Sequence, residues 1–135
     1  MNGEPRVIIY SKDLEGFGEK FQEVVKQAIS KERVEIYHSI ASLSWRLHKP
    51  IYASPVVVLF VLNKNDLAEI VSLHDLLIDS RVLLVLPGEE DEMVTMGHSL
   101  RPRFVGFRDA GLQDVSAVLQ KMVQGKIPQT LQTNA

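Results

Sequence analysis

Val56-Val57-Val58-Leu59-Phe60-Val61-Leu62 is an uninterrupted apolar run between Pro55 and the turn-like stretch Asn63-Lys64-Asn65-Asp66. The run is too short to cross a bilayer. It shows no alternation of polar and apolar side chains, so both of its faces must be covered by other parts of the protein. That pattern is typical of a central strand in a parallel sheet.

Four other segments have the length and composition of strands: 7–10, 34–38, 81–86 and 103–107. Stretches with apolar side chains three and four residues apart separate them, and these predict amphipathic helices. The expected helices cover 17–29, 39–49, 67–78 and 109–124, and a short one opens at the acidic run 89–92. Within them, we expect Trp45 to face inward and His74 and Ile78 to lie on the buried side of the third helix.

Five alternating strands and helices predict a single α/β domain of flavodoxin-like type over residues 1–125, followed by a flexible tail over 126–135. Right-handed crossovers and this number of strands favour a parallel sheet in the order 2-1-3-4-5, with helices on both faces. The predicted core contains Val7, Ile9, Val57, Leu59, Val61, Leu83 and Val85.

The composition excludes several classes of function. The net charge is −2 and there are no cysteines, so disulfides, thiolate metal sites and cysteine nucleophiles are ruled out. The basic cluster of Arg101, Arg103 and Arg108 is interleaved with Phe104 and Phe107, which we assign to a buried strand rather than to base stacking. We expect a soluble cytoplasmic protein that binds neither nucleic acid nor membrane.

A small-ligand or catalytic site in such a sheet lies at the carboxyl ends of the strands, beside the point where the strand order reverses. The candidate ligand-binding residues at those ends are Ser11, Asp13, Asn63, Asp66 and Gly88. Asp13 and Asp66 have two interpretations: they hold Mg²⁺ together, or Asp13 shapes a turn while Asp66 caps a helix. We favour the second, because Lys12 and Lys64 in the same loops repel a cation, and we expect no cofactor.

The order and lengths of the elements from Arg6 to Gln124 resemble the receiver domain of two-component response regulators. Receiver domains carry an acidic pair after the first strand and a phospho-accepting Asp at the end of the third. Ser or Thr follows their fourth strand and Lys-Pro follows the fifth. The carboxylates hold Mg²⁺, which with the Lys neutralises the acyl phosphate.

This sequence departs from that pattern at every one of these positions. The acidic pair falls on Ser11-Lys12, the phospho-acceptor on about Phe60, and the Ser or Thr near Pro87, while Arg108-Asp109 replaces Lys-Pro. We therefore expect a degenerate receiver, a pseudo-receiver that serves as a non-catalytic signalling or protein-interaction module. Two alternatives stay open: a small-ligand-binding protein or enzyme that uses the crevice at the ends of strands 1, 3 and 4, and an assembly subunit.

The resemblance also implies a surface for a protein partner or a second copy of the chain. In receivers this surface is formed by the fourth helix, the fifth strand and the fifth helix. Its counterparts here are Met93, Met96, His98, Arg101, Arg103 and Arg108, with the outer side of 114–121. Methionine and arginine both suit protein contacts, although the methionines have an alternative role as core residues.

Overall fold

The structure is a computed structural model, and it describes residues 6–13, 23, 31–51, 54–108 and 113–124. Apart from Glu23, the helix predicted over 17–29 lies outside the described residues, as does the tail predicted over 126–135. Among the helices of the described part, none is long and apolar enough to cross a membrane.

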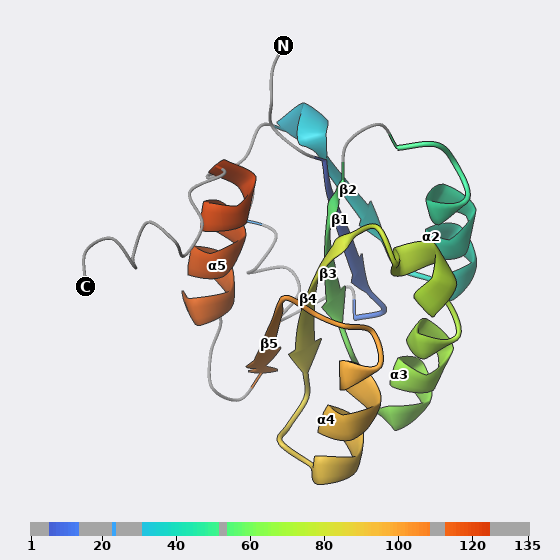
Figure 1. Ribbon diagram of the computed structural model, residues 1–135, viewed down its shortest axis with the longest axis vertical. Coiled ribbons are helices and arrows are strands. Elements are labelled where there is room, and N and C mark those ends of the chain that lie inside the picture. Colours follow the sequence, from blue (N-terminus) through green and yellow to red (C-terminus); the bar gives the residue numbers. More distant parts are fainter. Residues whose placement is uncertain (1–5, 14–22, 24–30, 52–53, 109–112, 125–135) are drawn as a thin grey trace.

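Five parallel strands form one sheet in the order β2-β1-β3-β4-β5, so the predicted topology is confirmed (Figure 1). The strands are β1 (Val7–Ser11), β2 (Val34–Tyr37), β3 (Val56–Phe60), β4 (Arg81–Leu86) and β5 (Phe104–Phe107). β3 is the central strand, as predicted from its apolar run. It ends at Phe60, two residues earlier than the run itself.

Helices cover both faces of the sheet (Figure 1). The helices α2 (Ile40–Leu47), α3 (Lys64–Val71) and α4 (Asp91–His98) lie on one face, and α5 (Gln113–Gln124) lies on the other. Two short 3-10 helices, η1 (Lys31–Arg33) and η2 (His74–Leu77), lie in the connections before β2 and β4.

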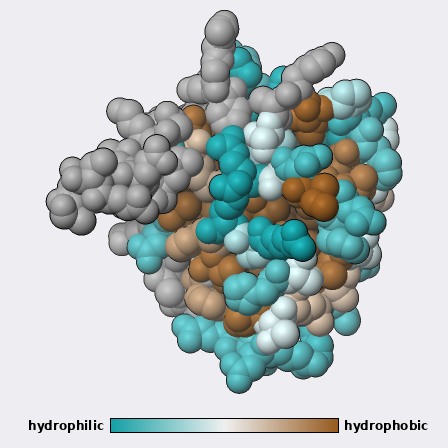
Figure 2. All heavy atoms as spheres, in the orientation of Figure 1, coloured by the Kyte–Doolittle hydropathy of each residue, from teal (hydrophilic) through white to brown (hydrophobic). Residues whose placement is uncertain are grey.

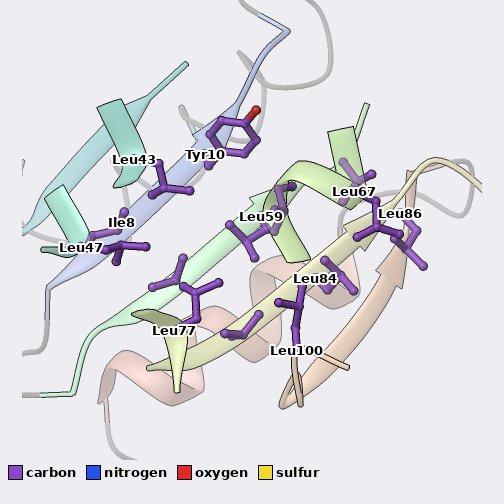
Figure 3. Packing of buried hydrophobic residues seen from close by; sticks show 14 of the residues in the cluster. Ile8, Tyr10, Leu43, Leu47, Leu59, Leu67, Leu77, Leu84, Leu86 and Leu100 are labelled. Carbon is purple, nitrogen blue, oxygen red and sulfur yellow. The ribbon is translucent and has the colours of Figure 1, made fainter. Parts of the chain in front are cut away.

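Alternate residues of each central strand point into two separate cores, as the pleat of a strand requires. On β1, Ile8 and Tyr10 join the core under α2, α3 and α4, which Figure 3 shows, whereas Val7 and Ile9 face α5. Every residue of the predicted core is buried: Val7, Ile9, Val57, Leu59, Val61, Leu83 and Val85.

Three side chains that were predicted to lie on the buried sides of two helices are exposed. Trp45 is 60% exposed, and the ammonium of Lys49 lies 4.6 Å from the centre of its ring. The third helix ends at Val71 rather than running to Ile78, because the chain turns into η2. Ile78 is therefore 68% exposed, and His74 is exposed as well.

Candidate functional site

The carboxyl end of β3 is occupied by a buried apolar side chain. Phe60, the last residue of the strand, is only 5% exposed. Around it lies a cavity of about 10 Å³, lined by Ser11, Asp13, Phe60, Val61, Leu62, Val85 and Arg108. The hydroxyl of Ser11 donates a hydrogen bond of 3.1 Å to the carbonyl oxygen of Asp13. A cavity of this size has room for about one water molecule and not for a substrate.

Asp66, only 1% exposed, is a buried carboxylate close to this strand end, in the first turn of α3. The hydroxyl of Tyr10 donates to its Oδ1 over 2.8 Å, and the backbone N–H of Leu62 donates to its Oδ2 over 2.9 Å. The positive end of the helix dipole also stabilises a carboxylate here. Asp66 is not the helix cap that we predicted: Asn63 caps α3, and its Oδ1 accepts from the N–H of Asp66.

Lys12 adds a cation to this group from the loop after β1. Its Nζ lies 2.9 Å from Oε1 of Glu69 and 3.7 Å from Oδ1 of Asp66. The hydrogen bond with Glu69 is the main reason that the pKa of Lys12 is raised, so the ammonium stays charged. The pair joins the β1 loop to α3. We call Tyr10, Lys12 and Asp66 the carboxylate cluster.

Tyr10 holds its proton strongly within the carboxylate cluster. Burial is the largest cause of its raised pKa, and the hydrogen bond to Asp66 adds to it. The phenol is therefore a neutral donor at ordinary pH. Sequence reasoning gave no role to Tyr10, and it did not predict that Lys12 pairs with carboxylates of α3. The available signal was a tyrosine in a buried strand, because a buried phenol needs a hydrogen-bond partner.

The carboxylate cluster does not fit a magnesium site. Both oxygens of Asp66 already accept hydrogen bonds, and the ammonium of Lys12 occupies the neighbouring position that a cation would need. No group of three or more acidic or histidine side chains with the arrangement of a metal site occurs among the described residues. Of the two interpretations of Asp66, helix capping was wrong: its carboxylate accepts hydrogen bonds from Tyr10 and Leu62, and Asn63 caps the helix.

The predicted ligand residues do not converge on one pocket. Ser11 and Asp13 line the small cavity beside Phe60. Asn63 and Gly88 line a separate, open groove of about 410 Å³ together with Leu62, Lys64, Pro87, Glu90 and Met93. Leu62 belongs to both linings and separates them. The crevice expected at the ends of strands 1, 3 and 4 is thus divided in two.

The predicted interaction surface is also divided. Met93 is 4% exposed and belongs to the core, which was the alternative role for the methionines, and Met96 packs half-buried against the same core. His98 is the last residue of α4, and it is exposed. The exposed arginines of this surface are Arg101 and Arg103, whereas Arg108 is half-buried beside Phe60.

Solved structures with the same fold include several receiver domains. The RcsB response regulator of Salmonella typhimurium matches with a TM-score of 0.66 at 13% identity, over 93% of this chain and 62% of that one. The signal receiver domain of an HD domain-containing protein from Pseudomonas fluorescens Pf-5 matches with a TM-score of 0.65 at 8% identity, over 91% and 97%. This chain thus spans less than two thirds of the RcsB chain.

A third likeness is to a putative pilus assembly-related protein from Burkholderia pseudomallei, with a TM-score of 0.57 at 18% identity, over 87% of this chain and 92% of that one. The sequence matches no protein-family model and no curated protein sequence. At these identities the likenesses concern the fold alone. The chain has the flavodoxin-like fold of response-regulator receiver domains.

Proposed function

We propose that this chain is a receiver-like signalling module that acts by protein contact and does not accept a phosphoryl group. The observation that carries the proposal is Phe60. Where a receiver places its acceptor aspartate, at the end of β3, this chain has a buried phenyl ring over a cavity of about 10 Å³. A phenyl ring has no nucleophilic oxygen, and a cavity of this size does not admit a phosphodonor.

The loop after β1 supports the same proposal. At the position of a receiver's acidic pair the chain has Ser11 and Lys12, and the ammonium of Lys12 is engaged by carboxylates of α3. A receiver needs Mg²⁺ there to offset the charge of the phosphoryl group. The ammonium of Lys12 is already paired with Asp66 and Glu69, so it does not replace Mg²⁺ in neutralising a phosphoryl group. The role left to the fold is recognition of another protein.

The proposal is tested by exposing the full chain to acetyl phosphate and Mg²⁺ and recording its intact mass at neutral pH, where an acyl phosphate survives. We expect the mass to stay unchanged, while a receiver with an acceptor aspartate, treated in parallel, gains a phosphoryl group. A phosphoryl adduct on this chain that disappears in Asp13→Asn would overturn the proposal, because Asp13 is the carboxylate beside the β3 end.

A further inference from the structure

The open groove between the start of α3 and the start of α4 has an apolar floor. Its lining includes Leu62, Pro87 and Met93, and it has a volume of about 410 Å³. Leu62, two residues after the end of β3, is 40% exposed. Because exposed apolar surface is costly in water, this floor gains free energy when an apolar group of a partner covers it.

The rim of the groove is strongly negative. Glu90 lines it and belongs to the acidic run Glu89-Glu90-Asp91-Glu92, whose four side chains are all exposed. One rim cation, Lys64, lines the groove, and its Nζ is bound to Oε1 of Glu92 at 2.6 Å. Within the described part of the chain, no basic side chain pairs with the three remaining carboxylates. Hydrophilic side chains gather along the lower edge of the molecule in Figure 2, where α4 begins in Figure 1.

Helix stabilisation accounts for only part of this charge. Asp91 and Glu92 lie in the first turn of α4, where the helix dipole favours them. Glu90 is the N-cap residue, yet its side chain makes no capping hydrogen bond and lines the groove instead. Glu89 lies one residue earlier, outside the helix. These two carboxylates are therefore available to a partner.

We propose that this groove binds a basic segment of a partner protein, with an apolar side chain of the segment on Leu62 and its lysines or arginines against Glu89 and Glu90. Charge complementarity selects this occupant, because an acidic or neutral segment would leave the rim carboxylates unpaired. The inference names a partner class for the interaction role proposed above. The groove shares Leu62 with the cavity beside Phe60, but the inference requires no chemistry at the end of β3.

The test uses the full chain and a fluorescein-labelled peptide in which lysine and leucine alternate, followed by fluorescence anisotropy in low salt. The double variant Glu89→Gln/Glu90→Gln should bind the peptide roughly fivefold more weakly, as expected for the loss of two rim charges. The matched control, Asp75→Asn/Asp79→Asn, removes two exposed carboxylates elsewhere and should bind like the parent. Leu62→Ser should also weaken binding, and amide resonances of Leu62 and Gly88 should shift.

Three results would overturn the assignment. Equal losses in the two double variants would mean attraction to the whole chain rather than to the groove. Equal binding of a peptide with serine in place of leucine would mean that the apolar floor of the groove does not contribute to binding. A monomer–dimer equilibrium abolished by Glu89→Gln/Glu90→Gln would assign the groove to a second copy of the chain. None of these depends on the phosphorylation test, so the two proposals fail separately.

Discussion

The end of β3 and the carboxylate cluster lie at the same edge of the sheet but treat polar groups in opposite ways. At the end of β3, where receiver chemistry takes place, the chain buries the phenyl ring of Phe60. In the carboxylate cluster it buries the carboxylate of Asp66, whose oxygens accept hydrogen bonds from Tyr10 and from the backbone of Leu62. The buried carboxylate thus holds α3 against β1, while the last residue of β3 is an apolar ring.

The first prediction concerns the Phe60 end. Phe60→Asp should lower the free energy of unfolding by about 4 kcal/mol, because it removes a buried ring and moves a carboxyl group out of water into its place. Phe60→Leu, the matched control, keeps the site apolar and should cost about 1 kcal/mol. Urea unfolding measures both. Equal, small losses would mean that this end of the sheet is open to solvent and that the ring of Phe60 is not part of the core.

The second prediction concerns the carboxylate cluster. Asp66→Ala should cost about 3 kcal/mol, because the hydroxyl of Tyr10 and the N–H of Leu62 would then be buried without an acceptor. Asp66→Asn retains one acceptor oxygen and should cost less. Glu69→Ala removes a half-exposed carboxylate from the same helix and should change stability by less than about 1 kcal/mol. If Asp66→Ala were no worse than Glu69→Ala, the cluster would not stabilise the fold.

The sheet was predictable from sequence because hydrophobic periodicity is set by burial, and its central strands β1, β3 and β4 are continuous runs of buried apolar residues apart from Ser11 and Arg81 at their ends. β4 (Arg81–Leu86) was predicted with its observed bounds, and the strand order followed from chain connectivity. The predicted end of β3 was too late, because the apolar run continues to Leu62 and hydrophobicity alone does not distinguish a buried residue from an exposed one. Leu62 follows the strand and lies on the surface.

The carboxylate cluster was not predictable in the same way. Tyr10 and Asp66 are far apart in the sequence, and their hydrogen bond depends on how the start of α3 packs against β1. The turn Asn63-Lys64-Asn65-Asp66 offers several residues that can cap a helix, and sequence does not choose between them. Because Asn63 takes the cap, α3 begins early enough to place Asp66 in its first turn, facing the sheet.

The third prediction sharpens the comparison by removing one hydroxyl. Tyr10→Phe should cost about 1.5 kcal/mol, the usual effect of losing a hydrogen bond to a charged group. The pKa of Tyr10 is raised in the folded protein from its ordinary value of 10.0. Above about pH 10 the unfolded chain therefore releases this proton while the folded chain keeps it, and stability falls as pH rises.

This pH dependence should be shallower in Tyr10→Phe than in the parent between about pH 9 and 11, as measured by urea unfolding. Tyr37, whose pKa is raised to about 12 by burial and by its hydrogen bond to Glu35, is present in both proteins and forms a common background. Parallel curves for the two proteins would contradict the assignment of the alkaline loss to Tyr10.

The smallest expected effect comes from Lys12, the solvent-facing member of the carboxylate cluster. Its side chain is 36% exposed, so water and salt weaken its attraction to Asp66 and Glu69. Lys12→Met should therefore destabilise the protein less than any cluster variant above, and the difference should shrink as salt is added. Lys64→Met is the matched control, since Lys64 pairs with the exposed Glu92. Lys12 faces a carboxylate that is only 1% exposed, so Lys12→Met should destabilise the protein more than Lys64→Met.

A double-mutant cycle that combines Lys12→Met with Asp66→Asn measures the coupling between Lys12 and Asp66 directly. A coupling of zero would mean that the two hydrogen bonds from Tyr10 and Leu62 satisfy Asp66 without Lys12, and that the ammonium serves only to join the β1 loop to Glu69.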